Sequence, residues 1–194
     1  MTDLTEIVCI LDRSGSMESI RTDAIGGFNA FLAAQQQLPG DARLTLVLFD
    51  HEYDRVLDAV PLAEVKPLTE ETYVPRGTTA LLDAVGRTLD DVGARLAATP
   101  EAERPGKVLV CILTDGLENA SRDYTRDRVK GMIEHQQQKY GWEFQFLAAN
   151  QDAFAAAGSI GIAAADAAAF VADAAGTHAA FARVSERAAR ARKR

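Results

Sequence analysis

The sequence is poor in the features that anchor, export or cross-link a chain. It has only two cysteines in 194 residues, and no apolar run approaches the ~20 residues of a membrane-spanning helix. No basic segment followed by an apolar one opens the sequence, so we expect a cytoplasmic protein that has no membrane contact. A disulfide between Cys9 and Cys111 is not expected there, and the lack of Cys/His ligand spacing gives a zinc site no support.

Long Pro- or Gly-rich stretches and blocks of one charge are also missing, while 47% of the residues are hydrophobic. We therefore expect a single domain over residues 1–194 with a core of its own. Lys and Arg number 21 against 28 Asp and Glu, a net charge of −7 that argues against nucleic acid as a partner. The basic residues gathered at 183–194 are interpreted as the solvated end of a helix, where cations are favoured.

Apolar strand-like runs alternate with helical patterns along the whole chain. Strands are predicted at residues 6–11, 43–50, 53–60, 107–114, 143–149 and 167–171. Helices are predicted at residues 16–37, 79–98, 124–140 and 176–194, with a short alanine-rich helix that ends near residue 157. This alternation indicates an α/β fold with a doubly wound, mostly parallel central sheet and helices on both faces. The strand at 53–60 follows so short a link that it can pair only antiparallel with the strand before it.

Side chains with oxygen donors follow two of the predicted strands. Asp12, Ser14 and Ser16 come directly after the first strand, and Asp115 comes directly after the strand at 107–114. In a doubly wound sheet these strands are neighbours, and ligands bind beyond the carboxyl ends of the strands. Oxygen donors without nitrogen or sulfur suit Mg²⁺, Mn²⁺ or Ca²⁺. Each residue also has a simpler role: Ser16 as a helix cap, Asp115 in a turn, and Asp12 as the partner of a backbone N–H.

These segments bear a family resemblance. Residues 10–17 (ILDRSGSM) resemble the Asp-x-Ser-x-Ser motif of von Willebrand factor A domains, and residues 113–116 (LTDG) resemble the Asp-Gly that ends a later strand in that family. Residues 77–81 (GTTAL) are similar to the loop whose threonine completes the family's metal-ion-dependent adhesion site, with Thr79 a better match than Thr78. The three motifs follow the family's order, and the resemblance covers essentially the whole chain.

The resemblance implies a binding module and not an enzyme. It implies that Asp12, Ser14, Ser16 and Thr79 hold an Mg²⁺, Mn²⁺ or Ca²⁺ ion directly or through water, and that Asp115 acts through water. An exposed Asp or Glu of a partner protein would fill the open position of the ion. It also implies a short antiparallel strand at one edge of the sheet. The sequence of these motifs resembles compact intracellular bacterial members of the family more than large extracellular adhesion modules. Some of those bacterial members occur together with stress-resistance systems.

Two other interpretations stay open, and the oligomeric state is not predicted. The first is a metal-dependent phosphoryl-transfer enzyme, for which the motifs offer no base and only Arg13 and Arg76 as basic neighbours. The second is a metal-free scaffold in which the same residues serve as caps and turns. Six residues on the adjoining loops are expected to shape selectivity: Arg13, Met17, Glu18, His51, Glu52 and Glu118.

Overall fold

The computed structural model of the protein describes residues 2–149 and 152–193, and its centre is one six-stranded sheet. The strand order is β3-β2-β1-β4-β5-β6. Every neighbouring pair is parallel except β2 and β3. The strands are β1 (Thr5–Asp12), β2 (Ala42–Phe49), β3 (Tyr53–Pro61), β4 (Lys107–Thr114), β5 (Glu143–Ala149) and β6 (Ala167–Phe170).

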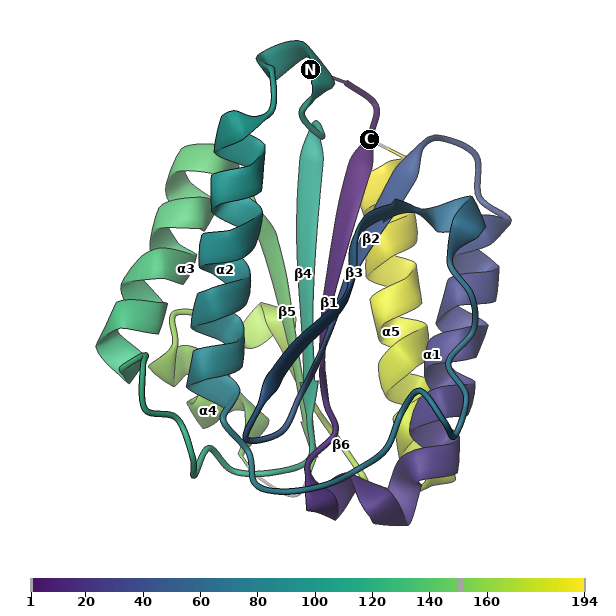
Figure 1. Ribbon diagram of the computed structural model, residues 1–194, viewed down its shortest axis with the longest axis vertical. Coiled ribbons are helices and arrows are strands. Elements are labelled where there is room, and N and C mark those ends of the chain that lie inside the picture. Colours follow the sequence, from purple (N-terminus) through teal and green to yellow (C-terminus); the bar gives the residue numbers. More distant parts are fainter. Residues whose placement is uncertain (1, 150–151, 194) are drawn as a thin grey trace.

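Helices cover both faces of this sheet (Figure 1). One face carries α1 and α5, and the other carries α2, α3 and α4. The α-helices are α1 (Arg21–Gln36), α2 (Leu81–Ala98), α3 (Arg126–Tyr140), α4 (Ala153–Ser159) and α5 (Ala174–Arg192). Short 3₁₀ turns are η1 (Gly15–Ile20), η2 (Leu62–Glu64), η3 (Glu101–Glu103) and η4 (Ala164–Asp166). The predicted fold class, a mostly parallel α/β sheet with helices on both faces, is confirmed.

The central strand β1 shows why the sheet needs both helical layers. All eight of its residues are buried. Successive side chains of a strand point to opposite faces. Accordingly, Cys9 and Leu11 pack in the core beneath α1 and α5, while Val8 and Ile10 pack in the core beneath α2 and α3. The continuous apolar run that predicted this strand therefore reflects burial on two sides.

The one antiparallel strand, β3, lies at an edge of the sheet, as predicted. It pairs with β2 from Arg43↔Pro61 to Phe49↔Tyr53, with register shifts between these ends. Only three residues separate β2 from β3 in the chain, and so short a link permits no parallel return. The partner of β1 on its other side is β4. The carboxyl ends of β1, β2 and β4 therefore lie side by side at the lower end of Figure 1.

Helices α1, α2 and α3 begin later than their sequence patterns indicate, and for α1 and α2 the difference bears on the polar residues in front of them. The chain leaves β1 through the 3₁₀ turn η1, and α1 begins only at Arg21. Helix α2 begins at Leu81, and Ala80 occupies its N-cap position without a side-chain cap. Ser16 and Thr79 are therefore not the N-caps of α1 and α2, and their hydroxyls are available for other contacts.

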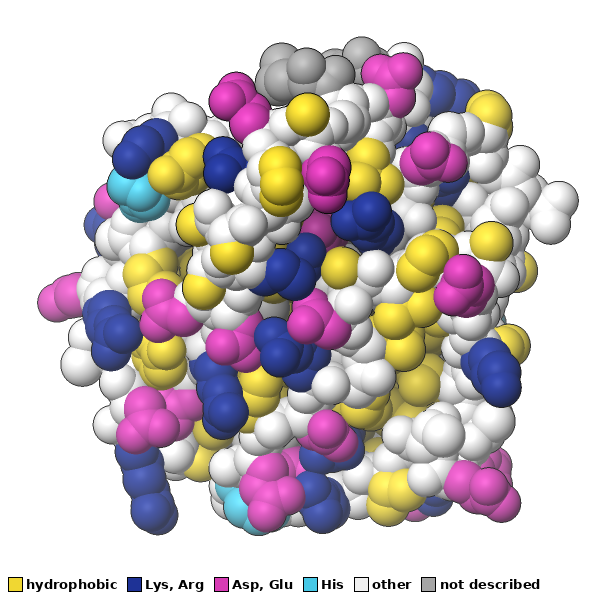
Figure 2. Space-filling view, turned by 45° about the horizontal axis from the view of Figure 1, so that its top comes forward, with side chains coloured by type: hydrophobic (Ala, Val, Ile, Leu, Met, Phe, Trp, Pro, Cys, Tyr) yellow, Lys and Arg dark blue, Asp and Glu magenta, His cyan; other side chains and the backbone are white. Residues whose placement is uncertain are grey.

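Two arginines of the basic C-terminal segment contact the rest of the molecule. Arg192 donates to the main-chain oxygens of Gln35, Leu38, Pro39 and Gly40 at the end of α1. Arg187 pairs with Glu143 at 2.8 Å and with Asp166 at 3.2 Å. Arg183, Arg190 and Lys193 are exposed, as expected for the solvated end of a helix, and Arg194 lies outside the described residues. Figure 2 shows acidic and basic side chains interspersed over one face. Among the described helices, none combines the length and apolar character needed to cross a bilayer.

Candidate metal centre

Asp12 ends β1 and is fully buried, with both carboxylate oxygens held by neighbours. Oδ1 accepts a hydrogen bond from the main-chain N–H of Ser14 at 2.6 Å. Oδ2 accepts one from the hydroxyl of Thr114, which ends β4, also at 2.6 Å. The hydroxyl of the buried Tyr73 donates to the main-chain oxygen of Asp12 from a loop 61 residues further along. The side chain is therefore held in one orientation by the turn after β1 and by the end of β4, while the loop that carries Tyr73 holds the main chain of Asp12.

The serine hydroxyls connect the end of β1 to the end of β4. Ser14 Oγ lies 3.1 Å from Ser16 Oγ, and Ser16 Oγ donates to Asp115 Oδ1 at 2.6 Å across 99 residues of sequence. Ser14 is 2% exposed and Asp115 is 5% exposed, whereas Ser16 lies on the surface. Four of the five predicted site residues are thus joined through hydrogen bonds or shared neighbours, at a point that solvent reaches.

Thr79 enters the same place from the loop in front of α2. It is 3% exposed, whereas the adjacent Thr78 is exposed to solvent. A Cβ atom built on Gly116 would lie 2.8 Å from the hydroxyl oxygen of Thr79 and 3.5 Å from that of Ser16. Both hydroxyls therefore face the Asp115–Gly116 turn closely enough that any larger residue at Gly116 would displace one of them. The structure brings Thr79, and not Thr78, to the predicted centre.

The two carboxylates of this centre are buried, and burial shifts their pKa values. It raises the pKa of Asp12 to about 6, an effect that the hydrogen bonds from Thr114 and Ser14 oppose and the nearby charge of Asp115 increases. Burial also raises the pKa of Asp115, against the hydrogen bond from Ser16. No ion pair joins either aspartate to a basic side chain in residues 2–149 and 152–193. Buried carboxylates are costly to ionise unless a cation balances them.

The donor set fits a hard divalent cation. Two carboxylates and three hydroxyls are all oxygen donors, the class that Mg²⁺, Mn²⁺ and Ca²⁺ prefer. Asp12 and Asp115 supply the negative charge that such an ion needs. The hydroxyls of Ser14, Ser16 and Thr79 are neutral, and each can turn its proton away to offer a lone pair.

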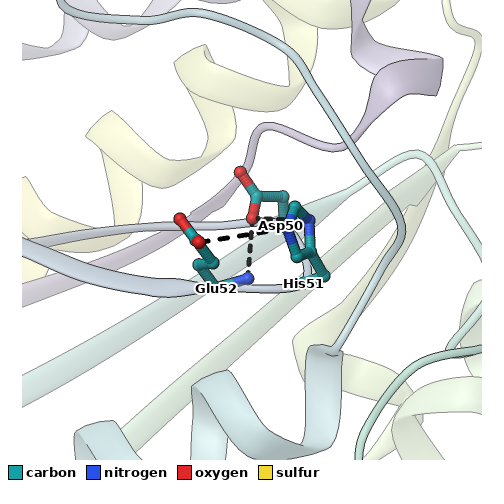
Figure 3. A group of neighbouring side chains, drawn as sticks. All are labelled: Asp50, His51 and Glu52. Carbon is teal, nitrogen blue, oxygen red and sulfur yellow. Dashed lines mark hydrogen bonds and ion pairs between the residues drawn. The ribbon is translucent and has the colours of Figure 1, made fainter.

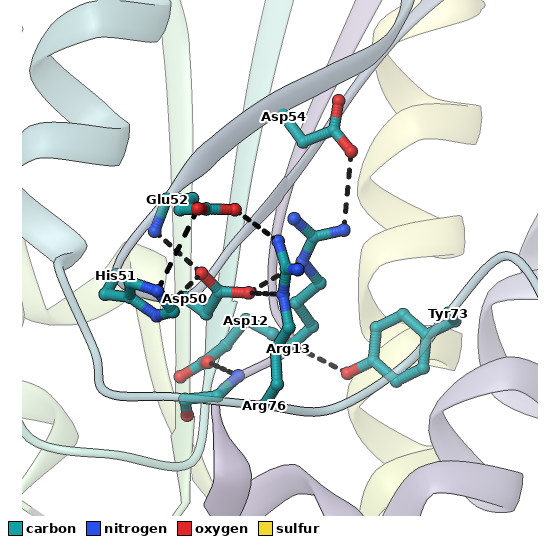
Figure 4. A network of polar contacts seen from close by, with 9 residues as sticks. Asp12, Arg13, Asp50, His51, Glu52, Asp54, Tyr73 and Arg76 are labelled. Atoms are coloured by element: carbon teal, nitrogen blue, oxygen red, sulfur yellow. Dashed lines mark hydrogen bonds and ion pairs between the residues drawn. The ribbon is translucent and has the colours of Figure 1, made fainter.

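A second acidic group lies beside this centre, after β2. Ligand atoms of Asp50, His51 and Glu52 all lie within 4.8 Å of one another (Figure 3). Figure 4 shows two guanidinium groups facing this group, and Asp50 Oδ2 accepts from Arg13 Nε at 3.0 Å and from Arg76 Nε at 2.8 Å. Arg76 also pairs with Glu52. Arginine therefore already balances the charge of this group.

These ion pairs also set the titration of Asp50. Burial by itself would raise the pKa of its carboxyl group. The hydrogen bonds from Arg76 and from the main-chain N–H of Glu52, together with the charge of Arg13, outweigh burial and lower the pKa. Asp50 stays ionised because its counter-charge comes from the chain.

Several of the loop residues expected to shape selectivity do not face solvent. Met17 is fully buried and Arg13 is 8% exposed, tied to Asp50, so a partner could reach neither without rearrangement. Glu118 turns toward its own chain, where Oε2 accepts from the main-chain N–H of Leu82 at 2.9 Å. Glu18, His51 and Glu52 are exposed as expected.

Sequence reasoning missed three residues that shape the centre: Tyr73, Thr114 and Asn119. Tyr73 and Thr114 donate hydrogen bonds to Asp12. Asn119 is hydrogen-bonded to Thr79 through both its side chain and its main chain. Thr114 carried a usable signal, because it is the last residue of a buried strand and directly precedes Asp115. Tyr73 and Asn119 lie in irregular segments, and no pattern marks either of them.

The fold of this chain is similar to the folds of solved structures. No protein-family model matches the sequence, and no curated protein does. The von Willebrand factor domain of the type V pilus tip protein Mfa5 from Porphyromonas gingivalis is 13% identical, with a TM-score of 0.65 over 97% of this chain and 96% of that domain. The chain has the von Willebrand factor A fold.

Two further solved structures agree with this fold. Proximal thread matrix protein 1 of the mussel byssus, solved with a zinc-occupied metal-ion-dependent adhesion motif, is 14% identical and has a TM-score of 0.63 over 97% of this chain. A von Willebrand factor type A protein from Catenulispora acidiphila is 17% identical, with a TM-score of 0.56 over 93% of this chain. The chain spans 46% of the mussel protein and 42% of the Catenulispora protein.

Proposed function

We propose that the protein is a divalent-metal-dependent protein-binding module, and not an enzyme. In this proposal Asp12, Ser14, Ser16, Thr79 and Asp115 hold the ion. One observation carries it: oxygen ligands from three separate loops converge on two buried carboxylates that no basic side chain of the described residues neutralises. The von Willebrand factor A fold and the all-oxygen donor set support the same function.

The partner would contribute an acidic side chain. A bound divalent ion supplies a positive centre to which a carboxylate can coordinate. Ser16 is exposed, so this position is open to a partner at the surface. Mg²⁺ is the ion we propose, with Mn²⁺ or Ca²⁺ as alternatives, because it takes oxygen ligands and usually keeps positions for water or an outside ligand.

The same reasoning bears on the enzyme alternative. Phosphoryl transfer needs basic side chains that clamp the phosphate. The two arginines beside the motifs, Arg13 and Arg76, are committed to Asp50 and point into that ion-pair network. This arrangement favours binding over turnover.

The remaining parts of the proposal concern context. We propose one domain over residues 1–194, because all described helices pack on one sheet. We propose a cytoplasmic location, which the free, buried thiols of Cys9 and Cys111 support. A part in a bacterial stress-response or resistance system rests on the resemblance in sequence and stays a prediction.

Metal binding is tested first, by isothermal titration with Mg²⁺, Mn²⁺ and Ca²⁺. The wild-type chain should bind, whereas Asp12→Asn should lose binding and Ser16→Ala should weaken it. His51→Ala, which alters the neighbouring acidic group, serves as the matched control and should bind like the wild type. Equal titration curves for the wild type and Asp12→Asn would favour the metal-free scaffold.

Partner chemistry is tested by selecting displayed peptides on the Mg²⁺-loaded chain. Enriched peptides should carry Asp or Glu, and binding should vanish in chelator or when that residue is replaced by Asn or Gln. Enrichment of the same peptides with and without Mg²⁺ would contradict the proposal. Hydrolysis of a phosphate monoester that stops on Asp12→Asn would favour the enzyme instead.

A further inference from the structure

Side-chain hydrogen bonds connect the loop that follows β4 to the beginning of α2. Glu118 accepts from the main-chain N–H groups of Leu82, Ala120 and Ser121. Ser121 Oγ accepts from the main-chain N–H of Asp83 at 3.0 Å. These contacts fix the loop as a whole, but they lie beyond Thr79 and do not touch it.

Another residue of this loop, Asn119, is hydrogen-bonded to Thr79 itself. Its side-chain oxygen Oδ1 accepts from the main-chain N–H of Thr79 at 2.9 Å. Its main-chain N–H donates to the main-chain oxygen of Thr79 at 3.0 Å. Both backbone polar groups of Thr79 are therefore taken by one residue, which stands four positions after Asp115 on the same loop.

The loop that carries Thr79 has few other means of holding that residue in place. From Val65 to Ala80 the chain forms no helix or strand. It crosses the strand ends through three main-chain hydrogen bonds: Arg76 N–H to the oxygen of Arg13 at 2.8 Å, Gly15 N–H to the oxygen of Gly77 at 3.1 Å, and Ala80 N–H to the oxygen of Asp50 at 2.8 Å. These bonds set the path of the loop on either side, while Asn119 sets the rotation of Thr79 between them.

We propose that Asn119 is a positioning residue of the metal centre, a role that rests on the proposed function. It locks the Thr79 backbone to the loop that carries Asp115, so the Thr79 hydroxyl is presented beside Gly116 and Ser16. Without the Asn119 side chain, the buried N–H of Thr79 loses its acceptor, and the residue rotates to find another. A bound ion would then lose one pre-oriented oxygen ligand, the Thr79 hydroxyl.

The test measures Mn²⁺ affinity by electron paramagnetic resonance of the free ion, with a thermal melt in chelator on each variant. Asn119→Ala and Asn119→Ser should each bind Mn²⁺ roughly tenfold more weakly than the wild type, the range found for residues that orient metal ligands. Ser121→Ala removes two hydrogen bonds of the same loop, the one from Asp83 N–H and the one to Glu118, without touching Thr79, and it is the matched control. It should bind Mn²⁺ like the wild type.

A double-mutant cycle separates positioning from general stability. In the Thr79→Ala background, adding Asn119→Ala should change Mn²⁺ affinity by less than about twofold, because the ligand that Asn119 orients is already gone. A purely structural role would instead lower the melting temperature in both backgrounds and leave Mn²⁺ affinity unchanged.

The outcomes distinguish the two proposals. Wild-type affinity in both Asn119 variants, equal weakening by Ser121→Ala, or independent effects of Thr79→Ala and Asn119→Ala would each overturn the positioning role and leave the metal centre standing. A wild-type chain that does not bind Mn²⁺ would overturn the proposed function, and the positioning role with it.

Discussion

Two buried aspartates stand at the ends of neighbouring strands, and they differ in where their counter-charge comes from. Asp50, after β2, receives the guanidinium groups of Arg13 and Arg76, and its pKa is lowered. Asp12, at the end of β1, receives a main-chain N–H group and a hydroxyl on its carboxylate, without a basic side chain among residues 2–149 and 152–193, and burial raises its pKa to about 6. The fold supplies a cation to the first carboxylate and only neutral donors to the second.

The source of the counter-charge distinguishes an acidic group with a structural role from an acidic group that can bind a cation. An acid that the chain has already paired contributes to stability and has little left to offer a ligand. An acid that is buried among hydroxyls, with a second acid close by, destabilises the fold until a cation arrives. Four measurements can test this contrast between Asp50 and Asp12.

The largest effect is expected from Asp50→Asn. This change leaves Arg13, which is 8% exposed, without its buried counter-charge. Removing one partner of a buried ion pair costs about 3–5 kcal/mol, so the free energy of unfolding should fall by about 3 kcal/mol in urea titrations with chelator present. A loss below about 1 kcal/mol would mean that Asp54 and Glu52 suffice for the arginines, as for surface pairs.

The next effect is a gain of stability on adding a divalent ion. At ~100 times its dissociation constant, Mg²⁺ or Mn²⁺ should add about 2.7 kcal/mol to the free energy of unfolding. Asp50→Asn should show the same gain as the wild type, because its carboxylate takes no part in the ion site. Calorimetric melts with each ion and with chelator measure this. A gain that depends on Asp50 and not on Asp12 would transfer the metal site to the neighbouring group.

A smaller effect of opposite sign is expected from Asp12→Asn in the absence of divalent ions. The substitution keeps the shape of the side chain and removes a buried charge that has no cation. Stability in chelator near pH 7 should therefore rise on the order of 1 kcal/mol. In saturating Mg²⁺ the order should reverse, with the wild type the more stable. Destabilisation in chelator comparable to that of Asp50→Asn would erase the contrast between the two aspartates.

The smallest effect concerns acid. Because the folded-state pKa of Asp50 is lowered, its contribution to stability is complete above the unfolded value of ~3.9 and is lost as the pH falls through the folded value. The difference in stability between the wild type and Asp50→Asn should thus stay constant from pH 7 to about pH 5 and narrow below pH 4. Urea midpoints over that range test it, and a difference that stays constant at acid pH would contradict the assigned ion pairs.

The strands of the central sheet could be predicted because their signal is local. The runs that form β1 and β4 are apolar on both faces, so their identity and buried position follow from composition over eight residues. The antiparallel direction of β3 followed from the length of its link to β2. The start of α1 was predicted five residues too early, because the 3₁₀ turn η1 precedes it. Nothing in the local pattern distinguishes a 3₁₀ turn from the first turn of an α-helix.

The predicted site residues carried a local signal of a different kind. The Asp-x-Ser-x-Ser spacing places Asp12 and its serines on one turn, and the strand end places Asp115 beside them, so their proximity could be predicted from the order of the strands. Their role as metal ligands stays a prediction. What could not be predicted is the support around them, because Tyr73 and Asn119 act through contacts that depend on how irregular loops cross the sheet.

The alternation of strands and helices, and the place of the oxygen-bearing residues at strand ends, follow from the order of the amino acids. Hydrophobic periodicity and motif spacing are properties of neighbouring residues. The choice of which aspartate receives a counter-charge depends on the folded chain: Arg13 is next to Asp12 in the sequence, yet its guanidinium pairs with Asp50. A side chain on a strand end can reach either neighbouring strand, and burial, packing and the path of the loops select the partner it pairs with.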